Sequence, residues 1–81
     1  MAVVPSIAQI GPWRLFFYSE EGTEPPHVHV RSGRATAKFW LGPVRLARSR
    51  RLADHQLREV QRIVEENERR ILEVWHERFA H

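Results

Sequence analysis

Hydrophobic and polar side chains alternate along most of the first half of the chain. Trp13, Leu15 and Phe17 occupy every second position of the first such segment, and this period of two is typical of a β-strand. The alternation recurs further on, so the pattern predicts four strands, over residues 13–18, 27–31, 34–41 and 44–48. Residues 1–11 fit either an N-terminal arm or an additional edge strand.

Glycine and proline separate these segments. Gly11-Pro12 precedes the first strand, and Gly42-Pro43 breaks the chain between the third and the fourth. Ser32-Gly33 lies between the second and the third, and we expect a two-residue hairpin turn there because glycine tolerates positive φ. Short strands joined in this way favour an antiparallel sheet over residues 12–49.

After Arg51 the period changes to that of a helix. Apolar residues recur three or four positions apart, which predicts a helical segment over residues 53–79: Leu57, Val60, Ile63, Val64, Ile71, Leu72, Trp75 and Phe79. A straight helix over residues 54–79 would be about 39 Å long, whereas a strand of about seven residues spans only about 23 Å. We therefore expect the helix to bend or split near Asn67, a weak helix former between two apolar clusters.

Together these elements predict a single α+β domain over residues 1–81. A four-stranded antiparallel sheet is followed by the C-terminal helical segment, which packs on one face of the sheet. Apolar residues make up 42% of the 81 residues, enough for one small core. There is no cysteine, no visible secretory signal and no apolar run near the roughly 20 residues of a membrane helix, so we expect a cytoplasmic protein that does not enter membranes.

The alternation also divides the sheet into two faces. Val28 and Val30 fall on the face that the helix is expected to bury, and His27 and His29 fall on the other. This second face, the open face, combines basic and aromatic side chains: Arg14, Phe16, Tyr18, His27, His29, Arg31, Thr36, Lys38, Trp40 and Arg45. Such a face can stack bases and hold phosphates, anchor a protein partner or a second copy of the chain, or consist of aromatics packed against each other.

The basic charge is concentrated in the sheet. The net charge is +3, but residues 1–51 carry eight basic and three acidic residues, whereas residues 52–81 carry five basic and seven acidic ones. Twelve of the thirteen basic residues are arginine, whose planar guanidinium suits phosphates, carboxylates and aromatic rings. The charge therefore favours either nucleic acid or an acidic protein as the partner.

Two histidines stand out on the second predicted strand. His27 and His29 are two positions apart, which places their Cα atoms roughly 6.5 Å apart on one face. That spacing suits an acid/base pair across a phosphodiester, with Arg14 or Arg31 supporting the phosphate. The candidate catalytic residues are therefore His27, His29 and Arg31.

A metal site at the histidines is less well supported. Zinc takes three or four protein ligands, and the only further candidates nearby are Glu20, Glu21 and Glu24 in a loop. Pro25-Pro26 can serve simply to make the start of the strand rigid. The sequence also has no glycine-rich phosphate loop, so we predict neither a metal nor another cofactor.

Three segments of the chain are distinctive: Pro25-Pro26-His27-Val28-His29, Lys38-Phe39-Trp40-Leu41, and the C-terminal Trp75-His76-Glu77-Arg78-Phe79. They resemble the bacterial domain-of-unknown-function family 4160, and the resemblance covers essentially the whole chain. The resemblance implies a small basic protein, often encoded beside a short protein of family 2442. It further implies a pair similar to a toxin–antitoxin module, in which the basic member is the toxin and the small acidic neighbour neutralises it.

The chain departs from the family pattern at two places. Gly42 stands where the family often has an acidic residue, and Arg51-Leu52-Ala53 stands where it often has Gly-Phe-Ser. The missing serine removes an N-cap, so we expect Asp54 to cap the helix instead.

Two classes of function follow. The first is a toxin-like protein that acts by docking on a cellular target, and the alternative is a small histidine-dependent nuclease or a protein that binds single-stranded nucleic acid. Docking requires a flat or ridged apolar patch, whereas a nuclease requires a concave site beside the histidines with converging arginines. The residues favour a non-enzymatic function, because the histidine pair alone does not complete an active site.

Overall fold

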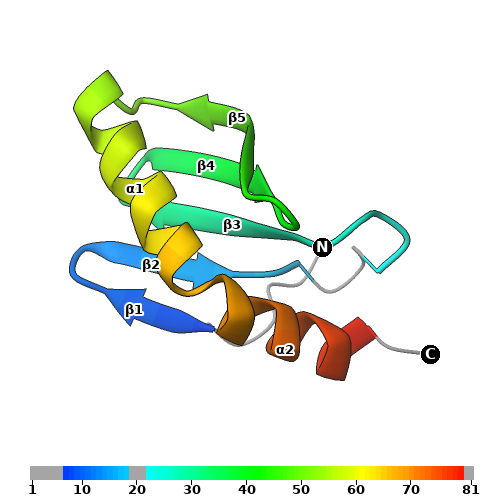
Figure 1. Ribbon diagram of the computed structural model, residues 1–81. Helices are drawn as coiled ribbons and strands as arrows, with labels where there is room; N and C mark the ends of the chain where they lie inside the picture. The colour runs from blue at the N-terminus through cyan, green and yellow to red at the C-terminus, as the bar shows by residue number, and fades with distance from the viewer. Residues whose placement is uncertain (1–6, 19–21, 80–81) are drawn as a thin grey trace.

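A computed structural model describes residues 7–18 and 22–79 of the chain. In chain order the elements are β1 (Ala8–Ile10), β2 (Trp13–Phe16), β3 (His27–Ser32), β4 (Ala35–Trp40), β5 (Arg45–Arg50), α1 (Asp54–Glu66) and α2 (Glu68–Phe79). The five strands form one antiparallel sheet in the order β1-β2-β3-β4-β5, and the helices follow it (Figure 1). The α+β architecture is confirmed, but the expectation of four strands was wrong.

The additional strand is β1. It lies in residues 1–11, for which the sequence allowed either an N-terminal arm or an edge strand. Ile10 pairs with Trp13, so Gly11-Pro12 is itself a two-residue hairpin turn, with Gly11 at φ +56°. Only three residues pair on this side, which is too short for a period of two to become visible in the sequence. Residues 1–6 of the predicted arm lie outside the described residues.

The hairpin between β3 and β4 turns one residue later than expected. Ser32 pairs with Ala35, so the central residues are Gly33 and Arg34 rather than Ser32 and Gly33. Gly33 has φ +59°, and a glycine with positive φ at the first central position is the requirement of a type II′ turn. The assignment of side chains to faces does not depend on this difference, because it follows from the alternation within each strand.

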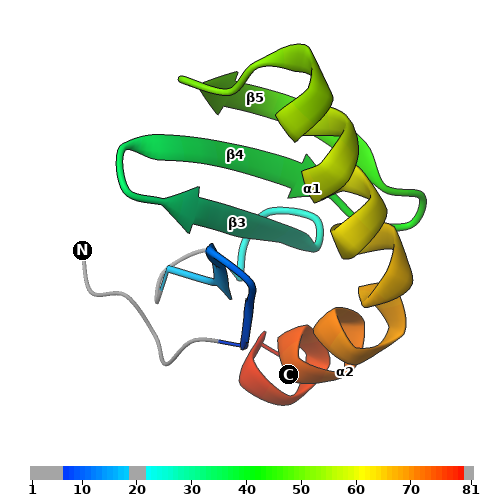
Figure 2. The same cartoon turned by 90° about the vertical axis from the view of Figure 1, so that its left-hand side faces the viewer.

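The helices cover one face of the sheet and form the core with it. Figures 1 and 2 show α1 crossing the strands and α2 continuing at an angle beyond the bend. Val28 and Val30 are buried, which confirms their predicted face. The core consists of Trp13, Leu15, Phe17, Val28, Val30, Ala37, Phe39, Leu41, Val44, Val60, Ile63, Val64, Ile71 and Trp75.

The helical segment divides at Asn67, as the sequence predicted. The Asn67 side-chain amide donates to the carbonyl of Ile63 at 2.8 Å, and its backbone N–H donates to the same carbonyl at 3.1 Å. This local pairing ends α1 and lets α2 begin in a new direction. As a result, Trp75 of α2 reaches Phe17, with their ring centroids 5.2 Å apart.

The start of α1 differs from the expectation for its cap. Ala53 occupies the N-cap position, and Asp54 is the first helical residue instead of the capping residue. The Gln56 side-chain oxygen accepts a hydrogen bond from the Ala53 N–H at 2.9 Å, so part of a capping box remains. Asp54 still contributes through its charge, because a carboxylate near a helix N-terminus is favourable.

One polar contact joins the sheet to α1. The indole N–H of buried Trp13 donates to a carboxylate oxygen of Glu59 at 2.9 Å. We expect Glu59→Ala to lower the free energy of unfolding by about 1–2 kcal/mol, because the indole N–H then loses its acceptor in a largely buried position. Glu59→Gln should lower the free energy of unfolding clearly less, since the amide oxygen can accept the same hydrogen bond. Urea denaturation measures both.

The control for this prediction is Glu66→Ala at an exposed position of α1. It should change the free energy of unfolding by less than about 0.5 kcal/mol. Equal destabilisation by Glu59→Gln and Glu59→Ala would contradict the role of the hydrogen bond.

Candidate functional site

Three rows of cross-strand neighbours lie on the face of the sheet opposite the helices. Residues that pair across antiparallel strands share a face, so the register defines each row. The rows are Phe16–His29–Lys38–Arg48, Arg14–Arg31–Thr36–Arg50 and His27–Trp40–Arg45. The rows contain every residue that the alternation assigned to the open face except Tyr18, which follows β2 and whose ring contacts that of His29. They also contain two arginines, Arg48 and Arg50, that the prediction did not include.

A β-bulge brings the two additional arginines to this face. Lys38 and Phe39 are adjacent in β4, but they pair with Arg48 and Leu46, so Ala47 is an extra residue in β5. Strict alternation would have placed Arg48 on the side of Leu46, toward the helices. The extra residue reverses the alternation, as a bulge does, and Arg48 joins the open face.

The sequence contains a signal for this bulge that the alternation alone does not reveal. β5 reads Arg-Leu-Ala-Arg-Ser-Arg, and without a bulge its last two arginines would point toward the core. An unpaired guanidinium is costly to bury. The strand is therefore easier to accommodate if one extra residue turns all three arginines to the solvent.

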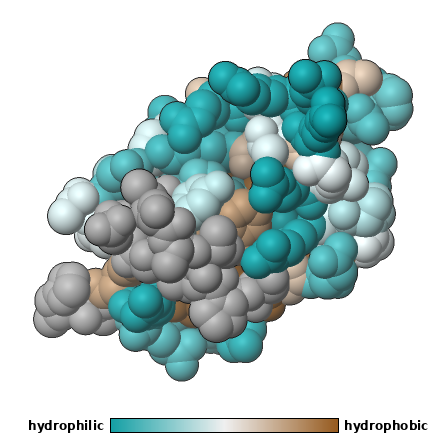
Figure 3. Space-filling model, turned by 180° about the vertical axis from the view of Figure 1, so that it is seen from behind, coloured by the Kyte–Doolittle hydropathy of each residue, from teal (hydrophilic) through white to brown (hydrophobic). Residues whose placement is uncertain are grey.

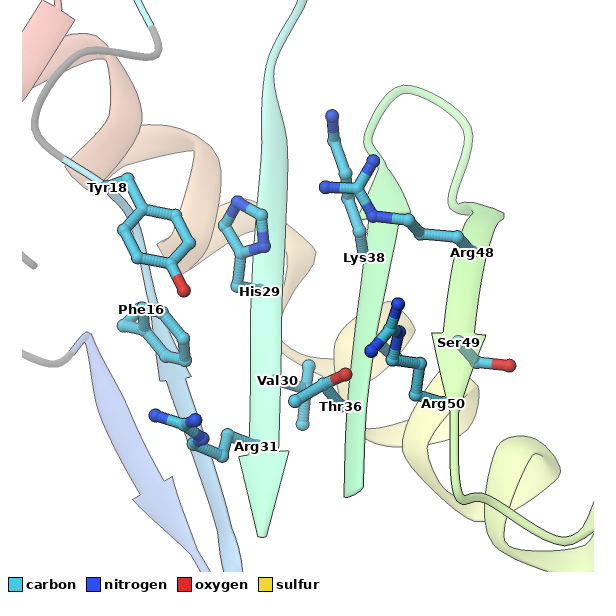
Figure 4. Close-up of a pocket in the computed structure, with 11 residues that line it drawn as sticks. Phe16, Tyr18, His29, Val30, Arg31, Thr36, Lys38, Arg48, Ser49 and Arg50 are labelled. Carbon is cyan, nitrogen blue, oxygen red and sulfur yellow. The ribbon is translucent and has the colours of Figure 1, made fainter. Parts of the chain in front are cut away.

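A pocket of about 140 Å³ lies between these rows (Figure 4). The described residues that line it come from β2 to β5 and from Tyr18, and none of these is acidic: Phe16, Tyr18, His29, Val30, Arg31, Thr36, Ala37, Lys38, Arg48, Ser49 and Arg50. In Figure 4 the Arg50 side chain extends toward Thr36, whereas the Ser49 hydroxyl points away. The polar groups around the pocket are mainly hydrogen-bond donors, which suits an anion.

Lys38 is the one lysine of the chain, and a carboxylate holds it in place. Its ammonium group donates to Glu24 at 2.8 Å and lies 4.5 Å from the ring centroid of Trp40. The Lys38 side chain is 9% exposed and that of Glu24 is 45% exposed. Much of the Lys38 charge is therefore balanced within the protein.

The arginines of the pocket differ from Lys38. Arg31, Arg48 and Arg50 are exposed, and none of them pairs with a carboxylate among residues 7–18 and 22–79. Their side chains come from β3 and β5, on two sides of the pocket. Uncompensated charges of one sign around a concave surface concentrate the field there. The pocket is thus a candidate anion-binding site.

The two histidine rings meet edge-on with centroids 5.2 Å apart, but only His29 lines the pocket. His27 has no exposed surface, and its Nδ1 atom lies 2.9 Å from the Pro25 carbonyl oxygen. Its ring centroid is 5.0 Å from that of Trp75, which approaches from α2, and 5.5 Å from that of Trp40. His27 was expected on the exposed surface, but these rings enclose it and it does not line the pocket.

His29 lines the pocket from the row Phe16–His29–Lys38–Arg48. Its ring stacks on Phe16 with centroids 5.6 Å apart and meets Tyr18 edge-on at 4.7 Å. Phe16 is only 3% exposed, and Arg14 lies 5.1 Å from its ring centroid. The aromatics on this face therefore pack against each other to a large extent, one of the arrangements that the sequence allowed.

The remaining candidate residues are distributed around this cluster. Arg14, Tyr18 and Trp40 are partly buried, whereas Arg31 and Arg45 are exposed. Most of the described residues that are visible in Figure 3, seen from behind Figure 1, are hydrophilic, and a narrow hydrophobic strip lies between them. The exposed part of the open face is thus cationic more than aromatic.

A family model named Domain of unknown function (DUF4160) matches residues 13–76. The chain belongs to this family. The matched range of the DUF4160 chain contains every residue of the pocket and leaves out β1. No curated protein and no solved structure matches the chain.

The described residues of the DUF4160 chain give no sign of a metal centre or of a membrane helix. Within residues 7–18 and 22–79, no three His, Cys, Asp or Glu side chains come together in a way that could hold a metal ion. The former ligand candidates Glu20 and Glu21 lie outside the described residues. Neither α1 nor α2 is long and apolar enough to cross a membrane.

The ion pair between Glu24 and Lys38 can be tested by a double-mutant cycle. We expect Glu24→Gln to lower the free energy of unfolding by about 1–2 kcal/mol, because buried Lys38 loses its carboxylate while half-exposed Glu24 is already partly solvated. Lys38→Met combined with Glu24→Gln should be less destabilising than the sum of the two single changes. Additive effects in urea denaturation would contradict a direct interaction.

Proposed function

We propose that the protein binds nucleic acid through backbone phosphates, with the pocket on the open face as the phosphate site. The observation that carries this proposal is the position of Arg31, Arg48 and Arg50, three exposed cations around one concave surface that has no acidic lining residue within residues 7–18 and 22–79. A concave site with converging arginines was the geometry expected of a nuclease, and the same arrangement suits phosphate binding without cleavage. A docking protein would instead need a flat or ridged apolar patch.

The chemistry of the pocket suits a phosphodiester. A guanidinium group can donate two parallel hydrogen bonds to phosphate oxygens, which gives orientation as well as charge. Thr36 and Tyr18 add hydroxyl groups to the lining of the pocket. Phosphate contacts of this kind position a nucleic acid without reading its sequence, so we expect binding with little sequence preference.

Base stacking should make a smaller contribution. Phe16 is buried, and Tyr18 and Trp40 present only part of their rings to solvent. An aromatic ring stacks on a base only where its face is accessible. We therefore expect affinity to come mainly from charge and to fall steeply with salt.

The burial of His27 favours binding over cleavage. A two-histidine mechanism needs both rings within hydrogen-bond reach of the reacting atoms, and only His29 lines the pocket. The toxin-like role and the acidic neighbour-encoded partner of family 2442 stay predictions from the resemblance. A surface that holds phosphates could serve that role by binding an RNA target.

This proposal predicts the effect of single arginine changes. Arg48→Ala and Arg50→Ala should each weaken binding of a labelled single-stranded oligonucleotide across different sequences. Each should also reduce the slope of log affinity against log salt by about one, because one phosphate contact is lost. Fluorescence anisotropy at several salt concentrations measures both quantities.

The matched control is Arg62→Ala, an exposed arginine on α1, which covers the other face of the sheet. It should leave affinity and salt slope almost unchanged. The proposal fails if the wild-type protein binds neither RNA nor DNA at low salt, or if Arg62→Ala weakens binding as much as the pocket variants do.

A further inference from the structure

β5 forms one edge of the sheet and pairs on one side only. β4 is its single neighbour in the strand order, and within residues 7–18 and 22–79 no backbone hydrogen bond joins Arg45–Arg50 to any other element. Along an edge strand, N–H and C=O groups point outward and can pair with another chain. The opposite edge, β1, has only three residues, so β5 offers the longer template.

The two sides of β5 differ in chemistry. Arg45 extends over the open face, and the bulge at Ala47 brings Arg48 and Arg50 to the same face. Leu46 lies on the other side, where it pairs with Phe39, and it is 42% exposed. Among the described residues, Leu46 is the one large hydrophobic residue that is exposed. The edge is thus cationic on one side and apolar on the other.

These charges determine which strand can pair with β5. A second copy of the chain would bring arginines against arginines, and like charges on neighbouring strands are destabilising. The same three arginines attract a strand with acidic side chains. Uncovered Leu46 requires an apolar residue on the other side of that strand, because burial of its exposed part is favourable.

We propose that the β5 edge binds an extended acidic segment of another protein by strand addition. The partner places acidic residues at every second position, over Arg45, Arg48 and Arg50, and apolar residues at the positions between them, beside Leu46. Backbone hydrogen bonds to β5 provide part of the affinity, and the alternating side chains provide the selectivity. The bulge at Ala47 interrupts the regular edge, so the added strand is short.

The added strand of the partner would also affect phosphate binding in the pocket. Arg48 and Arg50 belong both to the edge strand and to the pocket lining, so an acidic segment competes with phosphate for the same guanidinium groups. The competition rests on the proposed function, whereas the strand addition itself does not.

The probe is a synthetic peptide of about ten residues in which glutamate and valine alternate. Its control has the same composition, with all glutamates in one block and all valines in the other. We expect the alternating peptide to bind at least about tenfold more tightly by fluorescence anisotropy. Equal affinity of the two peptides would show that charge alone drives binding and would overturn the proposal.

N-methylation of the peptide tests the backbone pairing. An added strand turns every second N–H toward β5, so methylation of one alternate set should abolish binding and methylation of the other set should not. Amide hydrogen exchange should slow in β5 and remain unchanged in β1 when the unmodified peptide binds. Binding by both methylated peptides, or no added protection in β5, would contradict strand addition.

Two variants distinguish this proposal from nucleic-acid binding. Arg48→Glu combined with Arg50→Glu should weaken peptide binding about tenfold, because attraction becomes repulsion at two exposed positions. Arg31→Glu changes β3, two strands away from the edge, and should weaken oligonucleotide binding while it leaves peptide binding unchanged. If Arg31→Glu weakens peptide binding as much as the double variant does, the peptide does not lie on β5 and the proposal is wrong.

Discussion

Each strand of the sheet must turn alternate side chains toward the helices, and this constraint determines which side chains lie on the open face. Leu15, Val28 and Phe39 have no exposed surface beneath the helices. A shift of the register by one residue would exchange these side chains for histidine, arginine or lysine in the core, at a large cost in free energy. Packing of α1 and α2 on one face therefore determines which residues remain for the other.

The bulge at Ala47 follows from the same constraint. β5 contains three arginines at positions that a regular strand would divide between the two faces. One extra residue lets all three avoid the core, and it also gathers Arg48 and Arg50 beside Arg31 and His29. A requirement of stability thus produces the concentration of positive charge that makes an anion site.

Two other polar side chains of the open face, Lys38 and His29, are fixed by contacts within the protein. Lys38 pairs with Glu24, and His29 is packed between Phe16 and Tyr18. Lys38 therefore contributes little to an encounter with a ligand, because a charge that is already balanced has a weak long-range field. The arginines of β5 stay exposed, and they contribute to both proposed interactions, with phosphate over the pocket and with an acidic strand along the edge.

The sequence by itself determined the α+β class, the faces of Val28 and Val30 and the division of the helix at Asn67, because each depends on a local period or a single helix-breaking residue. It did not determine the β1 strand, the bulge or the burial of His27, and it therefore missed Arg48 and Arg50 as pocket residues. A three-residue strand and a bulge become visible only when a strand is aligned with its partner. His27 is enclosed because Trp75, 48 positions further along the chain, packs against it from α2. Contacts of this kind form only when distant segments fold together, so only the tertiary structure decides which polar residues reach the solvent.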